Sequence, residues 1–377
     1  MKLKYNFRFS YIAILLLAAV LNLLGVLVVR SASGLDSSAV SWQIIGSVVG
    51  FILCIVISFI DYHRLMKIWV FVYIAIIGIL LAVLLYGKVS HGAGRWLVLP
   101  VIGKVQPAEF AKAGLIFCYA SFFEKHQNYL NEPKIVFLSL FLFAVPAVLI
   151  LLEPNLSTTI IFFVIFACMY LVAGLNLKNI GLFTGIIAVF TGAMYFLFST
   201  GRYENIPFLQ DYQKRRILSF LDPAADADAY LQQANSILAI GSGGFFGKGL
   251  NSTDISSVKA GNFLIEEDTD FIFAIIGEEL GFRGAIVILL LFLLLIFVIL
   301  TVASKSNDAA GCVMCVGIAA WLGFQTFTNI AVSTALFPNT GVTLPFFSRG
   351  VSSLMAIYIG LGLVLNVILQ TTSRERK

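Results

Sequence analysis

The sequence is poor in charged residues and in histidine, and each shortage excludes a class of protein. Only 12% of its 377 residues are Asp, Glu, Lys or Arg, whereas about a quarter of the residues in a soluble domain carry charge. The formal net charge of +5 is too small to favour nucleic acid as a partner. The three histidines, His63, His91 and His126, are scattered along the chain and form no metal-binding pattern. The composition therefore excludes a water-soluble globular domain.

Cysteine is also scarce, and its placement excludes a disulfide framework. All five cysteines lie inside apolar stretches, where a free cysteine behaves as a small hydrophobic residue. Cys312 and Cys315 have the spacing of a redox motif, but the second pair that a zinc site requires is missing. We therefore predict no protein metal site.

Long apolar runs dominate what is present. Hydrophobic residues make up 59% of the chain, and the mean hydropathy is +0.95. A helix that crosses a bilayer needs about 20 apolar residues, and ten such runs begin near residues 11, 43, 68, 107, 135, 157, 180, 271, 309 and 352. The sequence therefore predicts an all-α polytopic membrane protein with ten transmembrane helices, in a single membrane domain that spans residues 1–377.

Basic residues predict the orientation of these spans. With the N-terminus inside, the cytoplasmic segments hold twelve Lys and Arg residues and the short outer loops hold five. Cytoplasmic loops are normally the more basic ones. We therefore expect a multi-pass protein of the plasma membrane, with both termini in the cytoplasm.

One segment is too long and too charged to be a simple connection. Residues 200–269, between the seventh and eighth predicted spans, carry six basic and nine acidic residues. Loops of this length inside a compact domain usually have a function. The predicted topology makes this segment a large extracytoplasmic loop, which we interpret as functional.

A first candidate site is the stretch Gln106–Lys112. Pro107 suits the first turn of a helix, and Glu109 and Lys112 lie three residues apart, on one helix face. They form either a structural ion pair or part of a substrate path, because ionisable groups within spans often face a cavity.

Arg95 and Trp96 are neighbours in a predicted outer loop. Trp96 is either an aromatic anchor at the membrane interface or a stacking surface for a sugar or lipid. In the second interpretation Arg95 binds an anion.

Two further groups in the large loop could bind phosphate. Arg215 and Arg216 follow Lys214 on the predicted outer face, where guanidinium groups match phosphate oxygens; solvated surface charge is the alternative. The glycine-rich run 241–249, with Ser242, Gly243 and Lys248, resembles a phosphate-cradling loop. It departs from the Walker A pattern, and a flexible turn is the alternative.

Asp270 closes an acidic run, residues 266–270, that opens the eighth span. Acidic residues at this position can simply complement the helix dipole. Asp270 is also the carboxylate nearest the apolar helix, where it could accept a proton.

Glu279 and Arg283 are four residues apart, and we expect them to pair. Residues 329–354 contain Pro338, Gly341 and Pro345, so this segment is predicted to be irregular and to form part of a cavity wall.

Taken together, the motifs resemble the SEDS family, the membrane glycosyltransferases of the RodA and FtsW type that build the bacterial cell wall. The resemblance covers essentially the whole chain. It rests on motifs in the expected order: Gly94–Leu97 (GRWL), Gln106–Lys112 (QPAEFAK), Glu153–Leu156 (EPNL), Arg216–Pro223 (RILSFLDP), Ala239–Gly244 (AIGSGG), Thr269–Phe273 (TDFIF), Gly277–Gly281 (GEELG) and Leu344–Phe346 (LPF).

The resemblance implies an enzyme that polymerises lipid II, in cell elongation, division or sporulation. The GlcNAc 4-hydroxyl would attack the donor, and undecaprenyl pyrophosphate would leave. Asp270 would be the catalytic base, while Trp96, Glu109 and Lys112 would belong to the substrate cavity. We expect Arg95, Arg215, Arg216 and Lys248 to stabilise the leaving group, with a divalent cation such as Mg or Mn as an optional cofactor.

The implied partners are a class B penicillin-binding transpeptidase, other membrane proteins of the elongasome or divisome, and membrane lipid, with no nucleic acid. Two alternatives stay open: a lipid II flippase, in which Glu109 and Lys112 would be transport groups, and a non-catalytic scaffold for the transpeptidase.

The chain departs from the family pattern at five positions. The family usually has Asp, Gly, Pro, Tyr and Gly where this chain has Asn155, Ser157, Ile265, Arg349 and Val351. These differences lie beside the predicted site, so they bear on its local geometry but leave Asp270 in place.

Overall fold

The computed structural model describes most of the chain. Described are residues 9–374 apart from 35–36, 91–92, 100–102, 175, 177–178, 180, 182–184, 186–191, 194, 206–208, 225, 253–256, 260, 262 and 266.

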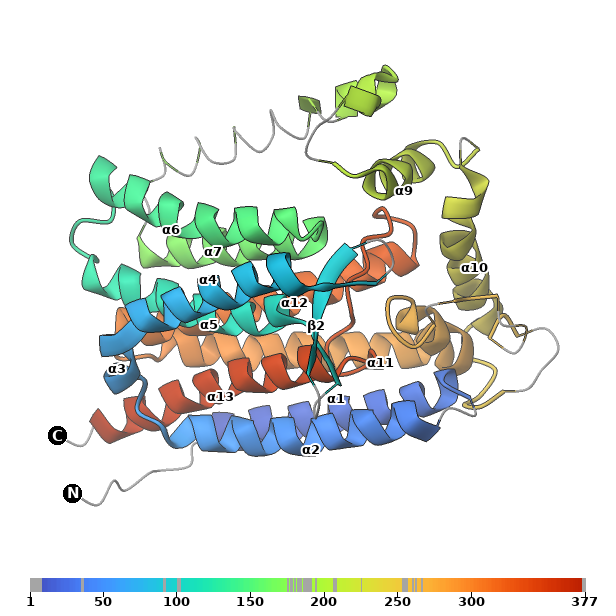
Figure 1. Cartoon of the computed structure of the whole chain (residues 1–377). Coiled ribbons are helices and arrows are strands. Elements are labelled where there is room, and N and C mark those ends of the chain that lie inside the picture. The colour runs from blue at the N-terminus through green and yellow to red at the C-terminus, as the bar shows by residue number, and fades with distance from the viewer. Residues whose placement is uncertain are drawn as a thin grey trace.

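Long helices that run side by side form most of the structure (Figure 1). They are α1 (Phe9–Ala32), α2 (Ser37–Phe59), α4 (Trp69–Tyr86), α5 (Pro107–Lys125), α6 (Pro133–Leu152), α7 (Leu156–Ala173), α11 (Ile272–Ser304), α12 (Ala309–Ser333) and α13 (Val351–Arg374). The shorter elements are α3 (Tyr62–Leu65), η1 (Met66–Ile68), η2 (Arg202–Asn205), α9 (Asp211–Leu221) and α10 (Ala227–Gly243). Strands β1 (Lys88–Ser90), β2 (Ala93–Leu99) and β3 (Gly103–Val105) pair antiparallel in sequence order.

Eight helices in the described part of the chain are long and apolar enough to cross a membrane. Helix α5 is not among them, because it carries Glu109, Lys112, Glu124 and Lys125. The seventh predicted span, near Ile180, lies mostly outside the described residues. The chain is therefore a helical multi-pass membrane protein, and the count of ten spans stays a prediction.

Burial separates the central helices from those that face lipid. The most apolar window of α13 is 83% buried and that of α12 is 67% buried, whereas the corresponding window of α4 is only 11% buried. Large apolar side chains such as Phe71, Leu85 and Phe297 point outward and are more than 60% exposed. An apolar exterior is stable only where the solvent is itself apolar, as in a bilayer.

Small residues allow the central helices to approach closely. A methyl group at Gly50 of α2 would lie 2.5 Å from the ring of Tyr358 on α13. One at Gly25 of α1 would overlap the carbonyl of Phe346. Because apolar side chains gain little from leaving lipid for protein, such tight packing is a main source of helix association in membranes.

The two ends of the bundle differ. At one end, hereafter the α10 end, α10 runs nearly perpendicular to the long helices, and α9 lies near the same end (Figure 1). Helix α3 lies at the opposite end, where α13 ends (Figure 1).

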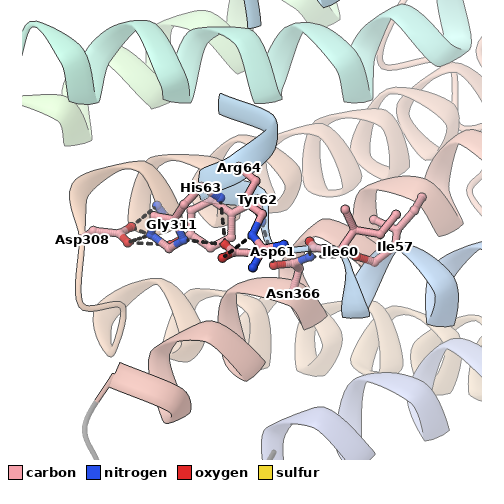
Figure 2. A network of polar contacts seen from close by, with 9 residues as sticks. All are labelled: Ile57, Ile60, Asp61, Tyr62, His63, Arg64, Asp308, Gly311 and Asn366. Atoms are coloured by element: carbon pink, nitrogen blue, oxygen red, sulfur yellow. Dashed lines mark hydrogen bonds and ion pairs between the residues drawn. The ribbon is translucent and has the colours of Figure 1, made fainter. Parts of the chain in front are cut away.

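A polar network ties elements together at the α3 end (Figure 2). His63 lies between two carboxylates, 2.9 Å from Asp61 and 2.7 Å from Asp308. The Tyr62 hydroxyl donates to Asp308 at 2.7 Å. The amide of Asn366 on α13 donates to a carbonyl near the end of α2 at 2.7 Å and accepts from the Tyr62 N–H. The network therefore joins α2, α3, α12 and α13.

Candidate functional site

Asp270 lies at the α10 end, directly before Phe271, the N-cap residue of α11. Its carboxylate faces Gly341, in the irregular segment between α12 and α13. A methyl group at Gly341 would lie 3.3 Å from Asp270 Oδ2 and 3.7 Å from Arg216 Nη1. Gly341 also has a φ of +69°, which disfavours any residue with a Cβ. Glycine at this position therefore lets the carboxylate and the guanidinium approach the same point.

Arg216 and Arg95 of β2 are the two guanidinium groups in the pocket lining that the described residues give. The ring of Tyr212 lies near both, with its centroid 5.6 Å from Arg216 Cζ and 6.0 Å from Arg95 Cζ. Tyr212 and Arg216 share α9, whose first turn is fixed by a capping box between Gln210 and Gln213. Their spacing of four residues places both side chains on one face of α9.

Arg95 is anchored to the turn between α6 and α7. Its Nε donates to the Glu153 carbonyl at 3.3 Å, and its Nη2 donates to the carbonyl of Pro154 and, at 2.5 Å, to the Tyr212 hydroxyl. Burial lowers the pKa of Arg95 from its usual value, as does Arg216, whereas Tyr212 and Asp270 raise it. The side chain therefore lies within electrostatic reach of both Arg216 and Asp270.

A buried carboxyl group lies beside this anchor. Glu153 is 1% exposed, and neither of its carboxyl oxygens has a hydrogen-bond partner among the described residues. Burial raises its pKa to about 8, although the charge of Arg95 partly opposes the shift. Glu153 therefore balances the positive charge of Arg95 less than an ordinary surface carboxylate would.

Arg95, Tyr212 and Arg216 line an open pocket. Its walls come from β2, the α6–α7 turn, α9 and the segment after α12, and they are formed by Arg95, Pro154, Leu156, Ser157, Tyr212, Gln213, Arg216, Ile217, Pro338, Asn339 and Thr340. The residue that follows Thr340 is Gly341, against which Asp270 lies. The pocket therefore combines two cations with an adjacent carboxylate, an arrangement suited to an anionic substrate that must lose a proton nearby.

Glu109 and Lys112 form an ion pair inside the bundle. Lys112 Nζ lies 2.8 Å from Glu109 Oε1 and 2.8 Å from Gln325 Oε1, and 4.9 Å from the centroid of the Trp321 ring. The Lys112 side chain is 1% exposed. Gln325 continues the network to Thr343, in the segment after α12. The pair is thus connected to the wall of the site through Gln325 but does not itself line the described pocket.

Trp96 and Arg215 are also outside the pocket lining given by the described residues. Trp96 is half-buried on β2, where it pairs with Lys88 in the strand register. The Arg215 side chain is 63% exposed and donates to Asp226 at 2.6 Å. Their substrate-binding roles stay predictions.

The glycine-rich run packs against α11. The backbone N–H groups of Lys248 and Gly249 donate to the carbonyls of Glu278 and Glu279 at 3.0 and 2.9 Å. A methyl group at Gly243 would overlap the carbonyl of Gly277. These N–H groups hold the turn to the helix, so they are not oriented toward an anion in this structure.

Two side chains of the run also contact α11. Lys248 Nζ lies 2.8 Å from Glu278 Oε1, and the Ser242 hydroxyl contacts the same carboxylate at 3.4 Å. Ser242, Gly243 and Lys248 line no part of the described pocket, and their role in binding substrate stays a prediction.

The expected pairing of Glu279 with Arg283 is wrong. Glu279 forms an ion pair with Lys259 and accepts from Ser31, while the Arg283 guanidinium lies 5.1 Å from the centroid of the Phe246 ring. The physical reason is a break in α11 at Gly281, which has a φ of +66°. The break removes the regular i, i+4 geometry on which the expectation depended.

The structure adds residues that sequence reasoning did not assign to the site. Tyr212 lies within a motif that was noted only for its charge, and Glu153 lies within a motif used only for the resemblance. Asn329 and Gly341 lie in the segment expected to form a cavity wall. For Gly341 the signal was available, because a glycine between Thr340 and Val342 in an irregular segment indicates a special backbone position.

The described residues offer no ready metal site. Among them, no three His, Cys, Asp or Glu side chains come together as ligands. The pocket beside Asp270 already contains two guanidinium groups, which disfavour a protein-held cation. The residues therefore do not fit a resident divalent ion.

Comparisons with known proteins point to one family. A family model described as "Cell cycle protein", for the FtsW, RodA and SpoVE group, matches residues 11–373. The chain is 34% identical to the "Probable peptidoglycan glycosyltransferase FtsW" of Geobacter sp. (strain M18), over 94% of this chain and 95% of the relative. It is 32% identical to the "Peptidoglycan glycosyltransferase MrdB" of Escherichia coli (strain K12), over 94% and 92% of the two chains.

Solved structures show the same fold. A chain from a peptidoglycan synthase complex that coordinates polymerization and crosslinking superposes with a TM-score of 0.78 at 27% identity, over 98% of this chain and 99% of that chain. The rod shape determining protein RodA of Thermus thermophilus superposes with a TM-score of 0.69 at 27% identity, over 99% and 98% of the two chains. The motifs, the fold and these matches together establish that the chain belongs to the SEDS family of FtsW, RodA and SpoVE type membrane proteins.

Proposed function

We propose that this protein is a peptidoglycan glycosyltransferase that polymerises lipid II into glycan strands for the bacterial cell wall. The observation that supports it is the meeting of Asp270 and Arg216 at Gly341, beside a pocket that also contains Arg95. Relatives named as peptidoglycan glycosyltransferases support the same activity.

The proposed reaction is a direct displacement with Asp270 as general base. The Asp270 carboxylate accepts the proton of the acceptor GlcNAc 4-hydroxyl as the oxygen attacks the anomeric carbon of the donor glycan. The new glycosidic C–O bond forms while the bond to undecaprenyl pyrophosphate breaks, and the anomeric configuration inverts. A positioned base of this kind typically contributes about 10²- to 10⁴-fold to the rate.

Arg95 and Arg216 supply the charge that the leaving group needs. Pyrophosphate departs as an anion and requires neutralisation rather than a proton, and guanidinium groups match its oxygens. Both side chains line the pocket, and Tyr212 lies near each of them. The described residues form no metal site of their own. A divalent cation, Mg or Mn, is therefore kept only as an optional cofactor, which removal with EDTA and re-addition tests.

We also propose the orientation and partners that the basic residues and the family imply. Both termini are cytoplasmic, and residues 200–269 lie outside, at the α10 end, where lipid II is available. A class B penicillin-binding transpeptidase is the main partner, alongside other membrane proteins of the elongasome or divisome. The similarity to a chain from a complex that coordinates polymerization with crosslinking supports such a pair.

The decisive experiment uses the purified protein with lipid II in detergent. The parent protein should form glycan polymer, and Asp270→Asn should form none that is detectable, because Asn keeps the shape of the side chain and removes its basicity. Asp211→Asn is the matched control, since the Asp211 side chain is 98% exposed at the start of α9; it should keep its activity.

Absence of polymer from the parent protein would favour a flippase or a scaffold. An active Asp270→Asn protein would refute Asp270 as the base.

A further inference from the structure

The backbone that leads into α11 is held at three consecutive carbonyl groups. The carbonyl of Asp268 accepts from the backbone N–H of Arg349 at 2.7 Å. The carbonyl of Thr269 accepts from the Ser348 hydroxyl at 2.6 Å. The carbonyl of Asp270 accepts from the Asn329 side chain at 2.8 Å. All three donors come from α12 or from the segment between α12 and α13, which are distant in sequence.

Asn329 also binds the opposite wall of the site. Its amide nitrogen donates to the carbonyl of Val342 at 2.7 Å, in addition to that of Asp270. Both partners are carbonyl oxygens, so only the N–H₂ end of the amide can face them. Asn329 is fully buried, which shields both bonds from water. One amide group therefore connects the backbone of Asp270 to the residue that follows Gly341.

Further bonds fix the same segment from its other side. The Ser157 hydroxyl at the start of α7 donates to the Thr340 carbonyl at 2.5 Å. Ser348 accepts from the Leu344 N–H at 2.7 Å while it donates to Thr269. Gly341 is thus bounded on each side by anchored residues, and the segment is held to α7, α12 and the Asp270 backbone together.

We propose that Asn329, Ser348 and the backbone of Arg349 act as a positioning clamp for Asp270. The clamp is defined by these three residues, and it fixes the distance between the carboxylate and the pocket wall at Gly341. Unpaired carbonyls in a non-helical turn would be free to rotate, and the side chain of Asp270 would move with them. A displacement of about 1 Å of a catalytic group costs on the order of 10²-fold in rate.

The proposal rests on Asp270 being the base, and it is tested with the same lipid II polymerisation assay. Asn329→Ala and Ser348→Ala each remove donors of the clamp and leave Asp270 in place. Each should lower kcat by about 10- to 100-fold while the KM for lipid II changes by less than about threefold, because the pocket cations are untouched.

Ser236→Ala is the matched control. The Ser236 hydroxyl is equally buried at the α10 end and donates to a backbone carbonyl, that of Ser333, at 2.7 Å, but it belongs to α10 and has no part in the clamp. Ser236→Ala should lose as much thermal stability in detergent as the clamp variants do, but its kcat should stay within about twofold of the parent value. If Asn329→Ala cannot be purified folded, Ser348→Ala decides the question.

The outcomes separate the clamp from the proposed function. The clamp is refuted if the clamp variants lose no more kcat than Ser236→Ala, or if their loss appears in KM instead. In both cases an inactive Asp270→Asn protein leaves the base assignment standing. An active Asp270→Asn protein would refute the base, whatever the clamp variants do.

Discussion

Residues that differ from the usual family pattern are accommodated by specific contacts. Arg349 forms an ion pair with Asp268, with Nε 3.0 Å from Oδ2. Asn155 caps α7 by accepting from the Thr158 N–H at 3.3 Å. Ser157 bonds the Thr340 carbonyl, a contact that glycine at this position could not make. Arg349 and Ser157 therefore add contacts near Asp270, whereas the cap made by Asn155 is one that Asp could also make.

Arg216 and Arg215 provide a test at the scale of single residues. Arg216→Ala should lower kcat/KM for lipid II polymerisation by about 10- to 100-fold, because it removes a charge-assisted contact to pyrophosphate, which is worth about 1.5–3 kcal/mol. Arg215→Ala should lose less than about threefold, because Arg215 pairs with Asp226 away from the pocket. Equal losses in the two variants would show that the loop acts through its overall charge.

Among the elements, α11 is unusual because it breaks within the bundle. At Gly281 the helix opens, and the N–H groups of Phe282 and Arg283 donate to the carbonyls of Gly244 and Phe245. The glycine-rich turn thus satisfies backbone groups that the break would leave unpaired. A stretch that resembles a phosphate loop in sequence therefore completes a helix in the fold.

The network of α2, α3, α12 and α13 gives a prediction about stability. Burial by itself raises the pKa of Asp308, but hydrogen bonds from His63, Tyr62 and the Gly311 N–H outweigh it and lower the pKa to about 2. The pKa in the folded state is below the unfolded value of about 3.9. The ionised Asp308 therefore stabilises the fold above pH 4, and this stabilisation is lost as the pH falls toward 2.

Asp308→Asn should therefore lower the free energy of unfolding in detergent at pH 7 by about 1–3 kcal/mol, seen as a lower melting temperature. The difference from the parent protein should shrink at low pH. Polymerisation below the unfolding temperature should change little, since the network lies at the opposite end from Asp270 (Figures 1 and 2). Arg64→Ala is the control, because Arg64 is 83% exposed and 3.9 Å from Asp61. A stability loss as large in Arg64→Ala would contradict this role for the network.

At the scale of the whole molecule, the exterior is apolar along the long helices, and polar groups concentrate at the two ends. Helix α9, which lines the pocket, lies at the α10 end, while α3, which holds His63 of the network around Asp308, lies at the opposite end (Figure 1). A bilayer around the middle of the bundle would separate the two ends, so the proposed chemistry would take place on one side of the membrane only.

Labelling of introduced cysteines tests this orientation. Tyr230→Cys in α10 and Glu375→Cys near the C-terminus should react with a membrane-impermeant thiol reagent from opposite sides of the membrane, with Tyr230→Cys labelled from outside. The parent protein, with its five native cysteines, gives the background. Labelling of both positions from the same side would refute the predicted topology.

Much of this protein follows from local sequence alone. Hydropathy over about 20 residues determines which segments can cross a membrane, and the spacing of three residues already places Glu109 and Lys112 on one helix face. The acidic run before an apolar helix singled out Asp270. The motifs identified the family without any structure. Each of these signals lies within a short stretch of chain, so no knowledge of packing is needed to detect it.

Only the tertiary structure decided which residues meet. Arg215 and Arg216 are adjacent in sequence, yet helix geometry turns one toward Asp226 and the other toward the pocket, because neighbouring residues on a helix do not face the same way. Arg95 lies 117 residues from Tyr212, and Asn329 lies 59 residues from Asp270. Contacts over such separations depend on how the helices pack, and no local pattern encodes them.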